Sequence, residues 1–181
     1  MIKLNSKITE RLLTYFFVNK DEEKYINELA KVLKLDPKNL DKKLKELETL
    51  GLFKSRFLGK QRYYSLNKNF PLLHEFEQII KKTTGLPLQI EKALQNIKGI
   101  ETAYIFGSYA LNKMNISSDI DLLVAGHHNV FDVQKAILPV QNFLGREINI
   151  VDLTPEEFNK RLKNKDPFLS DVFSRPMIKI L

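Results

Sequence analysis

The spacing of apolar residues predicts three helices in the first part of the chain. Apolar side chains recur at helical intervals over about 6–18, and a second, shorter helical stretch follows at about 25–33. A stripe of leucines marks a third helix, which we expect Gly51 to end. Asp36 and Pro37 are expected to begin it, because Asp caps exposed helical N–H groups and Pro suits the first turn.

The pattern then changes to aromatic-rich segments typical of strands. Residues 52–58 and 62–66 predict two β-strands, and the short glycine-containing segment 59–61 between them predicts a hairpin. A further amphipathic helix is expected at 70–84, ended by Gly85.

Beyond residue 86, predicted helices and strands alternate. The last predicted strand, 177–181, lies at the end of the sequence. Pro139 is expected to interrupt the helix predicted at 130–143. This order predicts an α+β protein whose second half is a small α/β domain with a short mixed sheet. Helices are expected at 87–98, 109–111, 130–143 and from 154, and strands at 102–106, 119–124, 146–151 and 177–181.

The composition excludes several classes of protein. The chain has 181 residues, 43% of them hydrophobic, which is enough for a core and rules out global disorder. It has no cysteine, which excludes disulfides, thiol catalysis and cysteine-based zinc sites. No apolar run is long enough for a membrane span, and the N-terminus lacks the apolar block of a signal peptide. We therefore expect a cytoplasmic protein with no membrane partner.

The net charge is distributed unevenly. Residues 1–85 contain 18 lysines and arginines against 11 acidic residues, whereas residues 86–181 contain 11 of each. The whole net charge of +7 therefore lies in the first half. This asymmetry indicates a module that binds a polyanion joined to a neutral one, with a soluble lysine-rich surface as the alternative.

The helices and hairpin of residues 6–68 resemble the winged helix-turn-helix domain of prokaryotic regulators. The resemblance implies that the third helix enters the major groove of double-stranded DNA and that the hairpin contacts phosphates or the minor groove. Lysines and arginines there would neutralise phosphates, and Asn39 and Gln61 would read base edges. The candidate DNA-binding residues are Lys38, Asn39, Lys42, Lys43, Lys45, Lys54, Arg56, Lys60, Gln61 and Arg62.

Winged helices also serve as dimerisation or protein-contact modules, so these functions are the alternative for this segment. A homodimer is a further expectation, because winged-helix proteins commonly read paired half-sites.

Chemistry is suggested by Gly107 and Ser108, which follow a predicted strand, and by Asp119 and Asp121 on the next strand. Residues two apart on a strand face the same side, so the two carboxylates should project together and would repel each other without a divalent cation. At a strand-to-helix turn, backbone N–H groups and a hydroxyl can hold a phosphate, which glycine allows to approach closely. This combination suits Mg²⁺-assisted nucleotidyl transfer.

The segments Gly107-Ser108-Tyr109-Ala110 and 117–124 resemble the signature of the DNA polymerase β-like nucleotidyltransferase superfamily, in particular its minimal prokaryotic members. The resemblance covers about residues 86–181. It divides the chain into a DNA-binding domain at 1–69, a linking helix at 70–85 and a nucleotidyltransferase-like domain at 86–181. It implies that Asp119 and Asp121 bind Mg²⁺ and are catalytic, and that Gly107 and Ser108 bind a nucleoside triphosphate.

The sequence departs from this family in two places. Active members carry a third carboxylate on a later strand. The matching position in this sequence is occupied by Asn149, whose amide cannot act as a base at neutral pH. Glu147, two residues earlier and on the same face, is the candidate substitute, whereas Asp152 should face the opposite way. Relatives also usually carry a basic residue and then glycine near position 112, where Lys113 would supply the charge for nucleotide binding.

Two functions therefore follow as expectations. The first is a DNA-binding regulator whose Mg²⁺-dependent domain transfers a nucleoside monophosphate from a triphosphate to a hydroxyl. The second is a domain that has lost turnover and acts as a nucleotide sensor or partner-binding platform. Resemblance to antitoxin-type minimal transferases adds a toxin-type protein as a candidate partner.

Overall fold

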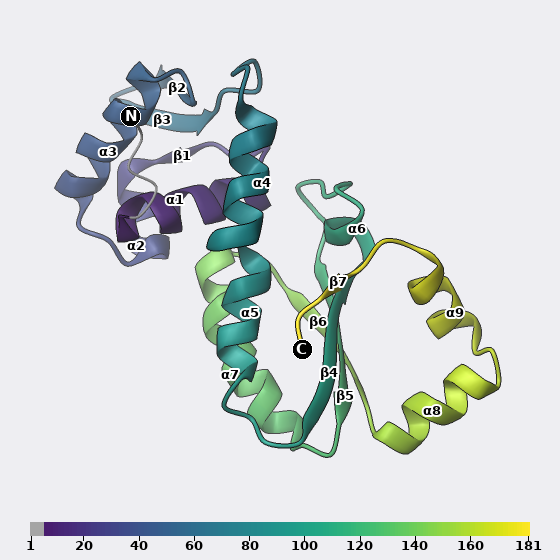
Figure 1. Ribbon diagram of the computed structural model, residues 1–181. Coiled ribbons are helices and arrows are strands. Elements are labelled where there is room, and N and C mark those ends of the chain that lie inside the picture. The colour runs from purple at the N-terminus through teal and green to yellow at the C-terminus, as the bar shows by residue number, and fades with distance from the viewer. Residues whose placement is uncertain (1–5) are drawn as a thin grey trace. The chain divides into compact units, whose positions relative to one another are not determined.

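The computed structural model describes residues 6–181, and these divide into two compact units with a boundary between Leu86 and Pro87 (Figure 1). Each unit has its own sheet and its own buried core.

The first unit begins with helices and continues into a β-hairpin, in the expected order. Its strands form an antiparallel sheet in the order β1-β3-β2. Strand β1 was not predicted, because two residues are too few to show an alternating pattern. The elements are α1 (Lys7–Val18), β1 (Lys24–Tyr25), α2 (Ile26–Leu33), α3 (Pro37–Thr49), β2 (Phe53–Leu58), β3 (Gln61–Leu66) and α4 (Leu73–Thr83).

Local signals begin α3 as predicted. The Asp36 side chain accepts a hydrogen bond from the N–H of Asn39 at 2.9 Å, and Pro37 occupies the first turn. Leu40, Leu44 and Leu47 are fully buried, so the leucine stripe forms the inner face of the helix.

Helix α4 packs on α1 within the first unit. The Thr14 hydroxyl donates to the carbonyl of Thr84 at 3.1 Å, and Lys20 forms an ion pair with buried Glu77 at 2.8 Å. The segment predicted as a linking helix therefore contributes contacts to this unit.

The second unit contains the predicted mixed sheet, in the order β6-β5-β4-β7, in which β5 and β6 are parallel and the other pairs are antiparallel. Figure 1 shows α5 and α7 on one side of this sheet and α8 and α9 on the other. The elements are α5 (Leu86–Leu94), β4 (Ile100–Phe106), α6 (Gly107–Ala110), β5 (Ile120–Gly126), α7 (Val130–Leu144), β6 (Ile148–Leu153), α8 (Pro155–Lys163), α9 (Pro167–Ser174) and β7 (Ile178–Lys179).

Both faces of the central strand β5 are buried, which explains its continuous apolar run. Leu123 and Ala125 pack with Leu153 and Leu169 beneath aromatic side chains of α8 and α9. Leu122 and Val124 point to the other face and are also fully buried.

Several predicted boundaries shift. Helix α7 runs uninterrupted through Pro139, because that residue lies on the exposed face, where water can hydrate the carbonyl it leaves unpaired. Helix α5 ends at Leu94 rather than at residue 98, and β6 begins at Ile148 rather than at residue 146. Within residues 6–181, none of the helices has both the length and the apolar character needed to cross a membrane.

Candidate functional site

Gly107 and Asp121 approach each other closely where β4 ends. Phe106 pairs with Asp121 across the antiparallel strands, and Gly107 follows directly with a φ of +69°. A Cβ at position 107 would lie 2.2 Å from the Oδ2 of Asp121. Only glycine therefore leaves room for this carboxylate, and the backbone conformation also favours glycine.

The Asp121 carboxylate lies beside Asp119 and Asn149. Asp121 is within β5, and the parallel register places Asn149 of β6 directly opposite it. Asp119 is exposed and lies one residue before β5, where its Oδ2 accepts a long hydrogen bond from the Asn149 Nδ2 at 3.5 Å. The structure thus brings the two predicted carboxylates together and places an amide beside them.

The electrostatics of this cluster disfavour two negative charges. Burial raises the pKa of the Asp121 carboxyl, a hydrogen bond from Asn149 lowers it, and the charge of Asp119 raises it. The net pKa of Asp121 lies above its ordinary value. A divalent cation between the carboxylates would relieve this repulsion.

The donor set fits Mg²⁺, which proteins commonly hold through one or two carboxylates together with substrate phosphates and water. Within residues 6–181, no group of three or more His, Asp or Glu side chains is arranged to hold a metal ion.

The candidate nucleotide-binding residues lie at the same end of the sheet. The Ser108 hydroxyl is 3.5 Å from the carbonyl of Asp119, to which it donates, and the N–H of Lys113 donates to the Ser108 carbonyl at 2.9 Å. The Lys113 side chain is exposed. These contacts connect the turn after β4 with the segment that leads into β5.

Glu147 does not occupy the position opposite Asp121. It immediately precedes β6 and is exposed, and its carbonyl accepts the N–H of Ile120 at 3.0 Å. Asn149 is therefore the residue in register with Asp121, at the position where the family resemblance places the third carboxylate. Asp152 accepts a hydrogen bond from the Nε2 of the buried His128 ring at 2.8 Å, which places it away from this cluster.

Some of the candidate DNA-binding residues of α3 and the hairpin form ion pairs within residues 6–181, and others do not. Lys43 pairs with Glu46 and Lys45 with Asp41 on α3 itself. Arg56 and Arg62 of the hairpin pair with acidic residues of neighbouring segments, Glu23 and Glu48 respectively.

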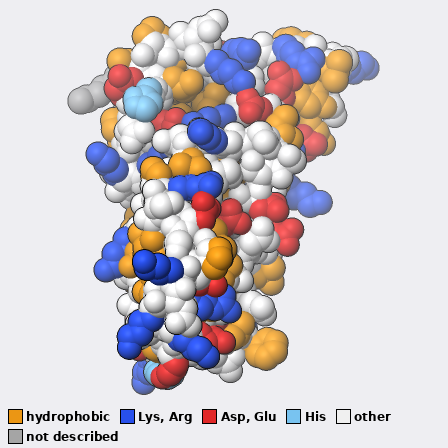
Figure 2. Space-filling view, turned by 90° about the vertical axis from the view of Figure 1, so that its right-hand side faces the viewer, with side chains coloured by type: hydrophobic (Ala, Val, Ile, Leu, Met, Phe, Trp, Pro, Cys, Tyr) orange, Lys and Arg blue, Asp and Glu red, His pale blue; other side chains and the backbone are white. Residues whose placement is uncertain are grey.

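The remaining lysines of this set are exposed and, within residues 6–181, form no ion pair; they are Lys38, Lys42, Lys54 and Lys60. The Asn39 side chain is exposed, whereas Gln61 accepts a hydrogen bond from the Tyr63 hydroxyl at 3.1 Å. Figure 2 shows one face of the molecule, on which basic side chains lie among acidic and hydrophobic ones.

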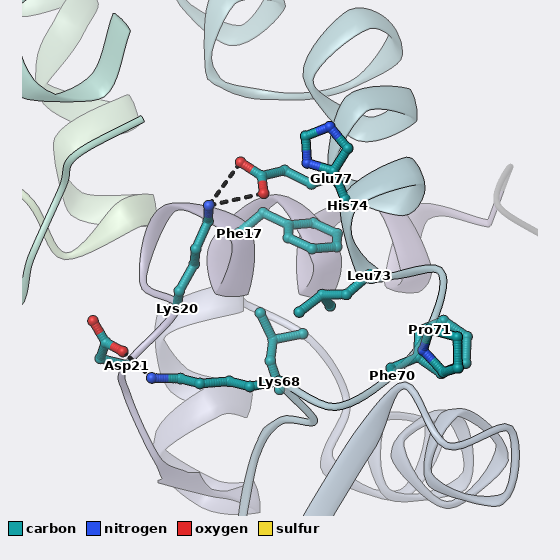
Figure 3. Close-up of a pocket in the computed structure, with 10 residues that line it drawn as sticks. Phe17, Lys20, Asp21, Lys68, Phe70, Pro71, Leu73, His74 and Glu77 are labelled. Atoms are coloured by element: carbon teal, nitrogen blue, oxygen red, sulfur yellow. Dashed lines mark hydrogen bonds and ion pairs between the residues drawn. The ribbon is translucent and has the colours of Figure 1, made fainter. Parts of the chain in front are cut away.

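Sequence reasoning missed a cavity of about 470 Å³ in the first unit, between the end of α1 and the start of α4 (Figure 3). Its apolar wall includes Phe17 and Leu73. Lys20 reaches both carboxylate oxygens of Glu77 at its edge. The lining residues come from distant segments, so no local motif reveals this cavity.

Comparison with known proteins identifies the second unit. The family model described as polymerase beta, nucleotidyltransferase matches residues 88–169. No protein of curated function matches the chain.

Two solved structures are similar to part of the chain. One, a crystal structure of a toxin-antitoxin with AMP-PNP, is 20% identical, covers 52% of this chain and 72% of its own, and has a TM-score of 0.39. The other, a candidate nucleotidyltransferase from Sulfolobus solfataricus, is 27% identical, covers 41% of this chain and 68% of its own, and has a TM-score of 0.28.

The matched range contains the glycine turn, both aspartates and Asn149. Residues 88–169 of this protein are thus a nucleotidyltransferase domain of the polymerase beta superfamily.

Proposed function

We propose that the second unit transfers a nucleoside monophosphate from a nucleoside triphosphate to a hydroxyl group. The observation that carries this proposal is the approach of Asp119 and Asp121 beside the glycine turn at Gly107, inside the range matched by the nucleotidyltransferase family. In such a transfer the acceptor oxygen forms a bond to the α-phosphorus, the bond to diphosphate breaks, and the hydroxyl proton leaves.

The residues of the site have distinct proposed roles. Asp119 and Asp121 would hold Mg²⁺, which when bound supplies positive charge to the triphosphate. The Gly107 backbone and the Ser108 hydroxyl would contact phosphate oxygens, and Lys113 would add a positive charge. Asn149 cannot take up the hydroxyl proton, so Glu147 or solvent must accept it.

Thermal unfolding tests this proposal without knowledge of the acceptor. Each of ATP, CTP, GTP and UTP would be added with and without Mg²⁺ to the wild type and to the Asp119→Asn/Asp121→Asn variant. A ligand at 100 times its Kd adds about 2.7 kcal/mol to the folded state. We expect a Mg²⁺-dependent rise in Tm that the double variant lacks; no rise with any nucleotide in the wild type contradicts the proposal.

Asn149 favours a second candidate, in which the domain binds nucleotide but does not turn it over. It would then act as a sensor or as a platform for a partner protein. Asn149→Asp discriminates between the two, because it restores a carboxylate opposite Asp121 with little change in shape. Transfer activity that appears only in this variant supports the sensor, and equal activity in wild type and variant supports the transferase.

For the first unit we propose a winged helix that binds double-stranded DNA as part of a transcriptional regulator. The succession of α1, α2, α3 and the β2–β3 hairpin supports this, as do the exposed lysines that form no ion pair within residues 6–181. A homodimer and a toxin-type partner remain predictions from the sequence.

DNA binding would be tested through its dependence on salt. Each phosphate contact contributes about 0.9 to the slope of log K against log salt concentration. We expect Lys42→Ala/Lys60→Ala to weaken binding and reduce the slope by about 2, while Lys98→Ala, an exposed lysine of the second unit, leaves it unchanged. Absence of binding, or a slope near zero, supports the protein-contact alternative.

A further inference from the structure

Arg146 forms hydrogen bonds to the turn at residues 115–118, which leads into β5. The residue is 8% exposed and lies between the C-terminal end of α7 and β6. Its Nη1 is 2.8 Å from the carbonyl oxygen of Asn115, 2.8 Å from that of Ile116 and 2.8 Å from that of Ser118. One guanidinium nitrogen therefore lies within hydrogen-bonding distance of three carbonyl oxygens of a single turn.

That turn is also closed by its own side chains. The Asn115 Oδ1 accepts hydrogen bonds from the N–H and the hydroxyl of Ser117, each at 2.9 Å. The Ser118 hydroxyl accepts the N–H of Asn115 at 3.0 Å. The side-chain bonds fix the shape of the turn, and Arg146 fixes its place on the domain.

The two aspartates depend on this turn to different degrees. Asp121 is paired on both sides, with Phe106 in β4 and Asn149 in β6. Asp119 precedes the strand and follows Ser118, one of the residues whose carbonyl Arg146 binds. The sheet ladder therefore fixes Asp121, whereas the position of Asp119 depends on the turn.

We propose that Arg146 is a positioning residue that holds Asp119 at the distance from Asp121 needed to bind a divalent cation. This inference rests on the proposed nucleotidyl transfer. In the proposed role Arg146 acts on Asp119 through the backbone carbonyls of the turn.

Arginine suits this task better than other residues. Its planar guanidinium can direct donors at several carbonyl dipoles. Lysine would supply a charge without the planar fork, and methionine would supply similar bulk without a donor. Loss of the donor would leave partly buried carbonyls unpaired and allow the turn to move.

Mn²⁺ binding, followed by electron paramagnetic resonance at a temperature where every variant is folded, tests the inference. We expect Arg146→Met to weaken Mn²⁺ binding at least tenfold and Arg146→Lys to weaken it less. Hydrogen exchange at residues 115–119 should increase in parallel. The matched control is Arg11→Met, because Arg11 donates to the carbonyl of Leu33 at 2.8 Å within the first unit, and it should leave Mn²⁺ binding unchanged.

The outcomes separate this inference from the proposed function. A wild type that takes up no Mn²⁺ overturns both. A wild type that binds Mn²⁺, together with Arg146→Met that unfolds at a lower temperature but binds Mn²⁺ equally, overturns only the inference, because Arg146 would then be purely structural. If Arg146→Met does not fold, Arg146→Lys takes its place. Unchanged Mn²⁺ binding and unchanged hydrogen exchange at residues 115–119 in that variant likewise overturn the inference.

Discussion

Replacement of Gly107 by alanine should displace the Asp121 carboxylate, and comparison with a glycine that has only the backbone strain isolates this effect. At a φ of +69°, an alanine costs about 1–2 kcal/mol relative to glycine. Its Cβ would also lie 2.2 Å from the Oδ2 and 3.2 Å from the Cγ of Asp121, both well inside van der Waals contact. The strand ladder holds the Asp121 backbone, so the carboxylate must rotate away.

Gly145→Ala provides the matched control. Gly145 has a φ of +64°, and among the described residues other than its neighbours along the chain no atom lies within 4 Å of the position that an alanine Cβ would take, so the substitution carries the backbone cost alone. Gly145→Ala should lose about 1–2 kcal/mol of unfolding free energy, at roughly 2–4 °C in Tm per kcal/mol, and Gly107→Ala should lose at least as much because the clash with Asp121 adds to the backbone cost.

The assay is the Tm with and without Mg²⁺ and nucleoside triphosphate. We expect the ligand-dependent rise to persist in Gly145→Ala and to disappear in Gly107→Ala. A Gly107→Ala protein that keeps the full rise would show that the Asp121 carboxylate does not need its present position, and the assignment of the site would be wrong.

Further predictions concern stability. Burial alone would raise the pKa of Glu77, but hydrogen bonds and charges from Lys20 and Lys81 outweigh it and hold the pKa below the ordinary 4.5. The ionised form therefore stabilises the fold above about pH 4.5, and this stability is lost as the pH falls through the lower folded pKa. Denaturant unfolding from about pH 6 to 3 should lose less stability with pH in Glu77→Gln than in the wild type; equal losses contradict the assignment. Asp36→Ala should lower the unfolding free energy of the first unit by about 1 kcal/mol through loss of the helix cap, and no change in the urea midpoint refutes this. Leu122→Ala should cost about 2–5 kcal/mol because the side chain is fully buried, and a cost below about 1 kcal/mol, measured in the same way, would show that the sheet relaxes around it.

The sequence predicts those features that depend on neighbours along the chain. The start of α3 follows from the side chain of Asp36 and the ring of Pro37, which act within one helical turn. The alternation of strand residues likewise predicts that Asp119 and Asp121 share a face and that Asp152 faces away from Asn149, whereas the expectation that Asn149 lies beside the two aspartates comes from the family resemblance.

Features that depend on tertiary contacts were not predicted. Pro139 is compatible with an unbroken α7 because the folded protein exposes that face, which local sequence does not determine. The role of Arg146 depends on carbonyls of a turn 28 to 31 residues earlier in the chain. The ion pairs of Arg56 with Glu23 and of Arg62 with Glu48 also join separate segments, so spacing alone does not indicate that these cations are already paired.

The amide at position 149 has an evolutionary consequence. Asparagine and aspartate codons differ by a single base, and the two side chains have almost the same shape. Because the parallel register already places residue 149 opposite Asp121, a point mutation would exchange the amide for a carboxylate without altering the strand. Under the proposed function, a lineage carrying this domain would pass between nucleotide sensing and turnover in a single mutational step that leaves the strand unchanged.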